Sequence, residues 1–228
     1  DQDFNSYTLN RAFQSHRQPG SSIKPLIVYT PAFERGYDPN TIVDDHKFEG
    51  GPSNATNTYA GKIQLRYAVA KSLNTVAWQV YEQVTPKVGL QYLKNMNFSS
   101  IVKDDYTLAT SLGGFTKGVS PLEMASAYTA LENDGMFRQP NCIKSIVDAD
   151  ENVVYSSQMA EVSIYEKDAT RTMTDVLTTV MDSGTGAALK LSNMPCAGKT
   201  GTTNDHKDGW FVGYTRYYTT SVWVGCDY

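Results

Sequence analysis

The chain has 228 residues and a mass of 25.2 kDa, enough for one large domain or two small ones with a substantial core. Apolar residues make up 40% of the chain and aromatic residues 11%, a composition that excludes a disordered tail. The net charge is −4, and no run of Lys and Arg resembles a phosphate-binding stripe, so nucleic acid is not an expected partner. No apolar stretch approaches the ~18 residues of a membrane-spanning helix.

Cysteine and histidine give no sign of a metal centre. Cys142, Cys196 and Cys226 are an odd number at no metal-ligand spacing, and the three histidines form no His-x-x-x-His pair. We expect the cysteines to be small, partly buried apolar residues, with a single disulfide as the alternative. No metal or cofactor is expected.

In the first half of the chain, apolar periodicity predicts two short helices, over residues 65–70 and 75–84. Ser72-Leu73-Asn74 separates them, because Ser and Asn favour helix caps over helix interiors. A polar, Gly-flanked loop over residues 49–61 precedes both helices, and the first 25 residues carry neither a cap nor a strand long enough to seed a sheet.

The second half contains two further predicted helices. Ser120-Pro121-Leu122-Glu123 combines a Ser cap, Pro at the first helical position and a Glu that closes a capping box. This helix places Met124, Tyr128 and Leu131 on one face and ends near Gly135. Residues 166–182 predict the other helix, closed by residues 183–186.

Three segments predict β-structure: a hairpin around residues 147–153 and two strands over residues 209–214 and 218–224, which are rich in aromatic and β-branched residues. Helices in the middle and strands at the end favour an α+β fold with an antiparallel sheet. We expect the chain to be a fragment of a longer polypeptide, because its last strand has no successor.

The first chemical motif is Ser21-Ser22-Ile23-Lys24. On a helix, this spacing places the Ser and Lys side chains on one face, one turn apart. A serine hydroxyl needs an adjacent base to become a nucleophile, and a lysine amine can serve if burial depresses its pKa. At a helix start, Ser21 would also lie beside backbone N–H groups that can stabilise an oxyanion. About one such motif is expected by chance, and Ser100-Ile101-Val102-Lys103 is a second match, interpreted as a solvated turn and strand.

The second motif is Ser72-Leu73-Asn74, also expected about once by chance. Its structural interpretation is a helix break with Asn as the cap. Its functional interpretation is a second hydroxyl that relays protons between the lysine and a leaving amine, with an amide that holds substrate.

The third motif, Lys199-Thr200-Gly201-Thr202, leads into the terminal strands and is expected by chance only about a tenth of a time. Gly201 in a strand indicates close approach of a ligand to the backbone. Lys199 supplies positive charge, and Thr200 and Thr202 supply hydroxyls on the same face of the strand. This pattern predicts a carboxylate site along a strand edge, the alternative being a surface strand that happens to carry a lysine.

The three motifs in this order are the signature of penicillin-recognising serine acyltransferases. The surrounding sequence resembles class A penicillin-binding proteins over essentially the whole chain, in these segments: Phe4-Asn5 to Arg11-Ala12, residues 17–25, 65–75, 111–114 and 118–125, and Gly198 to Asp205 followed by residues 210–215. The sequence departs from the family's usual residues at Ile23, Val76 and Arg216, none of which is a catalytic position.

The resemblance implies a penicillin-binding transpeptidase fold, in which an antiparallel sheet packs with a helical subdomain across residues 1–228. It implies a D,D-transpeptidase that cross-links peptidoglycan stem peptides and is acylated by β-lactams. Ser21 is then the nucleophile and Lys24 its base, and Ser72 and Asn74 relay the proton and hold the substrate amide. Lys199, Thr200, Gly201 and Thr202 bind the terminal carboxylate, with Lys199 charged, and the N–H groups of Ser21 and Thr202 form the oxyanion hole.

The family also carries an N-terminal membrane helix and a glycosyltransferase domain, and its transpeptidase fold ends in a further strand and helix. We expect the chain to be incomplete at both ends relative to this pattern. The resemblance places the parent protein on the extracytoplasmic face of the bacterial membrane, with membrane contact only through its N-terminal part.

Two other functions share the first and third motifs: a serine β-lactamase and a β-lactam-sensing binding domain. Class A β-lactamases activate water with a Glu in a Glu-x-x-Leu-Asn loop, but Ala70 stands where that Glu would precede Leu73-Asn74. The other acidic residues between the motifs, such as Glu82, Glu123 and Glu132, fall in predicted helices. The match over residues 111–135 also favours the transpeptidase.

Overall fold

The structure, a computed structural model, describes residues 8–158, 160–203 and 206–226. Phe4-Asn5 and Asn204-Asp205, quoted above for the family resemblance, lie outside these residues. The helical segments, including short 3-10 and π turns, are η1 (Gly20–Ile23), η2 (Pro25–Tyr29), α1 (Thr30–Phe33), α2 (Leu65–Ala70), α3 (Asn74–Val84), α4 (Pro86–Asn95), η3 (Lys103–Asp105), η4 (Leu108–Leu112), α5 (Pro121–Glu132), α6 (Lys167–Ser183) and η5 (Ala187–Leu189). The strands are β1 (Ile42–Asp45), β2 (Gly61–Gln64), β3 (Met136–Arg138), β4 (Ser145–Val147), β5 (Val153–Ser156), β6 (Glu161–Ser163), β7 (Ala197–Thr202), β8 (Asp208–Tyr214) and β9 (Thr219–Gly225).

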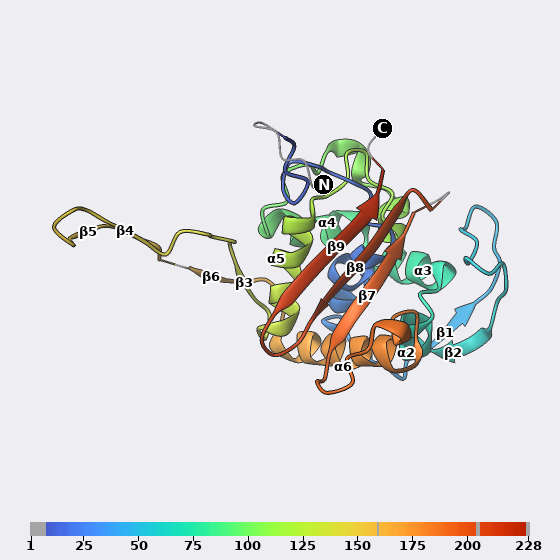
Figure 1. Cartoon of the computed structure of the whole chain (residues 1–228). Helices are drawn as coiled ribbons and strands as arrows, with labels where there is room; N and C mark the ends of the chain where they lie inside the picture. Colours follow the sequence, from blue (N-terminus) through green and yellow to red (C-terminus); the bar gives the residue numbers. More distant parts are fainter. Residues whose placement is uncertain (1–7, 159, 204–205, 227–228) are drawn as a thin grey trace.

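A buried helical segment over residues 20–33, formed by η1, η2 and α1, runs through the centre of the molecule (Figure 1). Ile23 and the run Leu26–Tyr29 are fully buried, as expected for a helix that is apolar on all sides. The sequence predicted only a helix start at Ser21. Pro25 and Pro31 interrupt the regular pattern, which explains why the full length of the segment was missed.

The main sheet has the order β7-β8-β9, with both pairs antiparallel. The two predicted terminal strands are therefore confirmed: β8 begins one residue earlier than predicted, and β9 is displaced by one residue. One face of this sheet packs against η1, α5 and α6, and β7 forms its edge. The sheet thus covers the central segment on one side, as Figure 1 shows.

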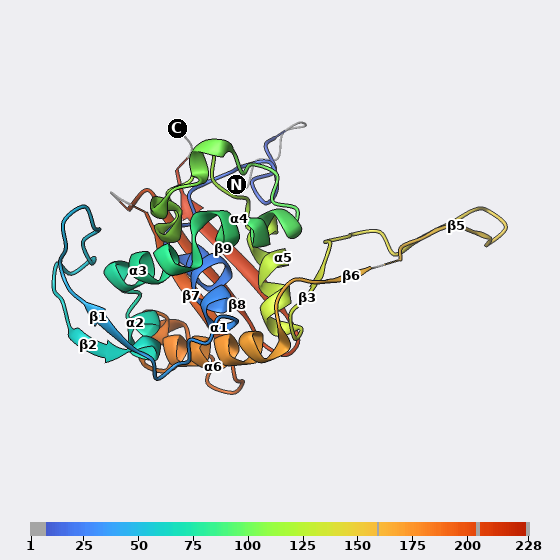
Figure 2. The ribbon, with the colours of Figure 1, turned by 180° about the vertical axis from the view of Figure 1, so that it is seen from behind.

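Helices α3 and α4 pack against the central segment on the side opposite the sheet, and α2 packs against α6 (Figure 2). The predicted helices over 65–70 and 75–84 are confirmed as α2 and α3. Helix α4 was not predicted. It follows α3 after the single residue Thr85, whose φ of +76° turns the chain and whose hydroxyl accepts from Val88 N at 3.4 Å.

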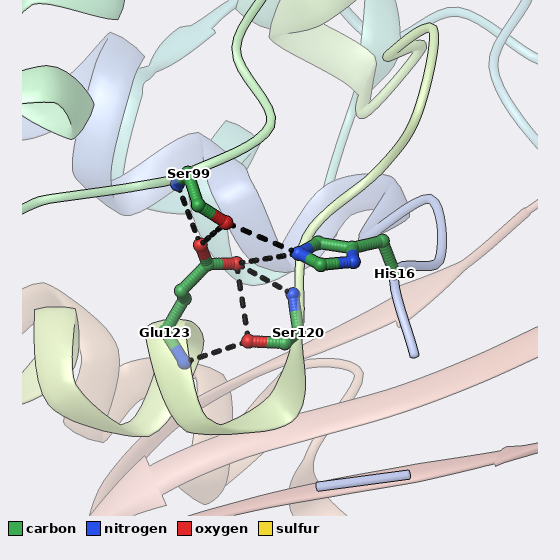
Figure 3. A network of polar contacts seen from close by, with 4 residues as sticks. All are labelled: His16, Ser99, Ser120 and Glu123. Atoms are coloured by element: carbon green, nitrogen blue, oxygen red, sulfur yellow. Dashed lines mark hydrogen bonds and ion pairs between the residues drawn. The ribbon is translucent and has the colours of Figure 1, made fainter. Parts of the chain in front are cut away.

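The predicted capping box of α5 is confirmed, and it belongs to a larger polar network (Figure 3). Glu123 accepts from Ser120 N at 2.8 Å and from Ser99 N at 2.7 Å, and lies 3.8 Å from His16 Nε2. Arg17, next to His16, pairs through its backbone with Val119. The network therefore fixes the strand-like segment that leads to Ser21 against the start of α5.

An arm that comprises residues 138–158 and 160–163 projects from the body of the molecule (Figures 1 and 2). Strands β4 and β5 form its hairpin, which confirms the predicted turn near residues 147–153. Every residue of both strands is exposed. The arm connects to the body through the β3–β6 pair.

Two minor expectations differ from the structure. Cys142 and Cys226 are exposed, so only Cys196 is partly buried as expected, and all three are unpaired. Ser100 is buried, with its hydroxyl unpartnered, and Lys103 begins a 3-10 turn, so the interpretation as a solvated turn and strand is wrong. No helix of the described residues has the length and hydrophobicity to cross a membrane, and no cluster of metal-ligand side chains occurs among them.

Candidate active site

The turn η1 places Ser21 at the point where the central segment meets β7. Gly20 has φ +53°, and a Cβ there would lie 2.7 Å from Thr202 O. A Cβ on Gly201 would lie 2.3 Å from Pro19 O. Glycine at both positions therefore allows the backbone of the nucleophile turn to contact the backbone of the third motif.

Side chains from the core hold this turn from the other side. Tyr128 OH donates to Ser22 O at 2.6 Å, and Trp210 Nε1 donates to Gln18 O at 2.9 Å. Ser22 Oγ donates to Pro19 O at 2.7 Å and is buried. Ser22 is thus engaged in the turn itself, whereas its neighbour Ser21 lines a cavity.

The second motif meets the first through Lys24, whose side chain is fully buried. Its Nζ donates to Ser72 O at 3.0 Å and to Asn74 Oδ1 at 2.9 Å, with Leu73 O more distant at 3.4 Å. Ser72 has φ +59°, a conformation that is unfavourable for a residue with a Cβ. This conformation directs its carbonyl to Lys24. Leu73, rather than Asn74, is the residue that precedes the first turn of α3.

The third motif meets the second through Lys199, which is also fully buried. Its Nζ donates to Ser72 Oγ at 2.8 Å and to Thr200 O at 3.0 Å. Ser72 therefore bridges the two lysines, with its carbonyl bonded to one and its hydroxyl to the other. Thr200 Oγ1 lies 2.6 Å from Thr185 Oγ1, in the loop that follows α6.

Burial and mutual repulsion govern the protonation of this lysine pair. Burial lowers the pKa of Lys24 well below its ordinary value, and the charge of Lys199 lowers that pKa further. Burial lowers the pKa of Lys199 from 10.5 to about 7. With this pKa, Lys199 loses its charge as the pH rises through about 7 when no anion is bound, and the expectation that it stays charged beside a substrate carboxylate remains a prediction. A carboxylate beside it would favour the charged form.

A cavity of about 840 Å³ connects the three motifs. Its lining includes five of the predicted site residues, Ser21, Ser72, Asn74, Thr200 and Thr202. The other three, Lys24, Lys199 and Gly201, are buried beneath this surface. All eight predicted residues are therefore brought together by the fold.

The edge of β7 that is not paired with another strand faces the nucleophile turn. β7 pairs with β8 only, and the carbonyl of Thr200 accepts from Lys199. Residues two apart in a strand direct their peptide groups to the same edge, so the N–H of Thr202 also points away from β8. A Cβ on Gly20 would lie 2.9 Å from Thr202 N, so this N–H lies next to η1.

Sequence reasoning assigned no role to several residues that line the cavity, among them Asp45, Asn54 and Thr185. Asn54 lies in the polar loop noted above, and Thr185 in the segment interpreted only as the end of a helix. Asp45 gave no signal, because it ends a short strand in which no motif was seen. Asp45 is the only carboxylate among the described lining residues.

Comparison with known proteins gives consistent matches. A family profile described as the penicillin binding protein transpeptidase domain matches residues 1–226. The chain is 36% identical to Penicillin-binding protein 4 of Bacillus subtilis (strain 168), covering 99% of this chain and 37% of that protein. It is 34% identical to Penicillin-binding protein 1A/1B of the same organism, covering 95% of this chain and 26% of that protein. The chain thus spans little more than a third of these relatives at most.

Two solved structures share the fold. The D,D-transpeptidase domain of a peptidoglycan glycosyltransferase from Eggerthella lenta superposes with a TM-score of 0.79 at 25% identity, covering 94% of this chain and 61% of that one. The PonA1 protein from Mycobacterium tuberculosis, in complex with penicillin V, superposes with a TM-score of 0.85 at 24% identity, covering 98% of this chain and 64% of that one.

Proposed function

Since this chain belongs to the penicillin-binding protein transpeptidase domain family, we propose that it is a serine D,D-transpeptidase that cross-links peptidoglycan stem peptides. The family match confirms the resemblance to class A penicillin-binding proteins. The observation that carries the proposal is the convergence of two buried lysines on Ser72, beside Ser21 in one cavity.

In the acylation step, Ser21 Oγ attacks the carbonyl between the two terminal D-alanines while Lys24 accepts its proton. A neutral lysine amine has two N–H donors and one lone pair. The two shorter bonds, to Ser72 O and Asn74 Oδ1, use both donors. The lone pair then remains to take the proton of Ser21, as a general base requires.

Lys199 has the complementary role. As an ammonium it has three donors, of which Ser72 Oγ and Thr200 O use two. The third is available for the terminal carboxylate of the donor peptide, which the Thr200 and Thr202 hydroxyls also bind. Backbone N–H groups of Ser21 and Thr202 stabilise the oxyanion.

Collapse of the tetrahedral intermediate breaks the amide bond and releases D-alanine, whose amine receives a proton through Ser72. Asn74 Oδ1 accepts from Lys24 and its Nδ2 donates to Ser53 O, which leaves one N–H for the substrate amide. An amine of a second stem peptide then attacks the ester carbonyl, its proton passes through Ser72 to Lys24, and the ester C–O bond breaks as Ser21 Oγ takes a proton back from Lys24. β-Lactams acylate Ser21 in the same way.

The surroundings of Asp45 favour this function over a β-lactamase. Rapid hydrolysis of the acyl-enzyme needs a base that activates water. Both oxygens of Asp45 already accept protein donors, Asn54 and Thr75 at Oδ1 and Ala60 N at Oδ2. Glu82, Glu123 and Glu132 lie in α3 and α5 and do not line the cavity. We therefore expect a penicilloyl adduct that persists for roughly tens of minutes or longer, because a general base typically contributes ~10²–10⁴ in rate.

The test is the intact mass of the protein after brief exposure to benzylpenicillin. One adduct per chain is expected on the peptide that contains Ser21. Ser21→Ala should abolish it, while Ser100→Ala should leave it unchanged. Loss of the adduct within seconds, with excess penicillin destroyed, would assign the chain to the β-lactamases. Acylation without release of D-alanine from a donor peptide would indicate a sensor.

For the parent protein, we propose by the same resemblance a membrane-anchored, extracytoplasmic enzyme that also carries a glycosyltransferase domain. The basis for this part of the proposal is the length of the relatives and the name of the domain from Eggerthella lenta.

A further inference from the structure

The N-terminus of α3 is capped by a residue from a distant loop. Leu73 precedes the helix, and its side chain has no acceptor for the free backbone N–H groups of the first turn. Asn54 Oδ1, twenty residues earlier in the chain, accepts from Asn74 N at 2.8 Å and from Thr75 N at 3.3 Å. A side chain of another segment thus performs the function of a local helix cap.

The orientation of Asn54 is fixed by Asp45 at the end of β1. Asn54 Nδ2 donates to Asp45 Oδ1 at 2.7 Å and to Thr58 O at 3.0 Å. Asp45 also accepts from Thr75 Oγ1 and from Ala60 N. Asn54 and Asp45 are only 3% and 1% exposed, so water cannot replace these bonds without opening the loop.

The same loop also binds the side chain of Asn74. Asn74 Nδ2 donates to Ser53 O at 2.9 Å, and Asn74 Oδ1 accepts from Lys24 Nζ at 2.9 Å. The loop therefore holds both the backbone and the amide of the residue that bonds to the lysine of the first motif. A displacement of the loop would move this acceptor.

We propose that Asn54 and Asp45 are positioning residues for the acylation step, acting as a remote cap that fixes Asn74 and, through it, the Lys24 amine against Ser21. This inference rests on the proposed function. It assigns a purpose to the polar loop over residues 49–61, which the three motifs do not include. The action is geometric, because neither side chain is needed to accept or donate a proton during the reaction.

The first test measures the second-order rate of acylation by a fluorescent penicillin, on protein whose folding is verified by near-UV circular dichroism. Asn54→Ala should lower the rate by on the order of 10²-fold, the effect of displacing a reacting group by about 1 Å. Asp44→Asn is the matched control. Asp44 is the exposed neighbour of Asp45, and within the described part of the chain its carboxylate pairs with His46 alone. The acylation rate of Asp44→Asn should equal that of the unmodified chain.

The second test uses Asn54→Asp, which keeps the acceptor for Asn74 N but places two carboxylates together. The introduced carboxylate and that of Asp45 do not both ionise readily at this distance. A proton shared between them replaces the N–H that Asn54 donates to Asp45. The acylation rate of this variant, divided by that of the unmodified chain at the same pH, should rise by about tenfold as the pH falls from 8 to 5. Asn54→Ala should show no such recovery.

A merely structural role would lower the melting temperature but leave the rate of the folded protein and its pH ratio unchanged, and this result would overturn the proposal. If Asn54→Ala does not fold, the pH-dependent recovery of Asn54→Asp decides alone: a flat ratio refutes the positioning role. Failure of the unmodified chain to be acylated, or labelling that survives Ser21→Ala, would instead refute the proposed function.

Discussion

Lys199 should give the acylation reaction a pH dependence that depends on the charge of the substrate. Its pKa is lowered to about 7 by burial, so its ammonium is the main form below pH 7 and is lost as the pH rises. A substrate with a free carboxylate needs that ammonium, whereas an ester-capped analogue does not. We therefore compare a penicillin with its methyl ester.

The magnitude follows from the titration. With a pKa of about 7, about 1% of Lys199 remains charged at pH 9, so the loss of this charge alone should lower the rate with the free acid by about 100-fold between pH 6 and pH 9. Lys24 acts in the opposite direction. Its pKa is lowered by burial and by the charge of Lys199, so neutral base accumulates as the pH rises. The free acid should show a bell-shaped profile and the ester only the rising limb.

The assay is the second-order acylation rate, by stopped-flow fluorescence, from pH 5 to pH 9.5 for both compounds. The two lysines titrate as a coupled pair, so the apparent pKa values belong to the site as a whole. Lys199→Met should remove the falling limb, with the remaining rate similar for acid and ester. Identical profiles for acid and ester in the unmodified chain would refute the assignment of Lys199 to the carboxylate.

Three further outcomes are expected. Gly201→Ala should cost about 1–3 kcal/mol of unfolding free energy and slow acylation, because its Cβ would meet Pro19 O at 2.3 Å. The control Gly209→Ala, whose Cβ would lie 3.6 Å from the nearest atom, should change neither quantity, and equal effects of the two variants in urea titrations would contradict this. Thr185→Val should raise KM for a carboxylate substrate by about tenfold or less, because it removes the bond to Thr200, and should not lower kcat. A fall in kcat alone would contradict this prediction. Replacing residues 141–157 of the exposed arm by a short turn should leave acylation unchanged and shift Tm by at most about 2–4 °C. A larger shift of Tm in calorimetry would show that the arm stabilises the rest of the fold.

Local signals predicted the regular elements well. The capping box at Ser120 and Glu123 located α5, and alternating aromatic and β-branched residues located β8 and β9. Helix α4 and the central segment over residues 20–33 were missed, because Pro residues and direct helix-to-helix junctions hide the 3.6-residue period. These segments are stabilised by burial against other parts of the chain, which a local window does not contain.

The eight candidate site residues could be proposed from the sequence because their motifs are short and contiguous. The sequence could not show which side chains of the three motifs bond to one another in the folded chain. The bond between Lys199 and Ser72 joins residues 127 apart, and the cap of Asn54 on α3 depends on a loop closed by Asp45. Such contacts depend on tertiary packing. The same packing lowers the pKa of Lys199, so its protonation near neutral pH was also beyond sequence reasoning.

Ser72 contributes to the site through two chemically independent groups, its main-chain carbonyl and its hydroxyl. Alanine substitution deletes only the hydroxyl, so the kinetics of Ser72→Ala report the bond to Lys199 and the proton relay to the leaving amine, and leave the carbonyl's bond to Lys24 in place. The carbonyl depends instead on the left-handed conformation of the residue, with φ +59°. A β-branched residue at this position would oppose that conformation, and Ser72→Thr, which keeps a hydroxyl, should therefore perturb the contact that alanine scanning leaves intact. For this residue, the substitution that looks most conservative is the one that probes the backbone.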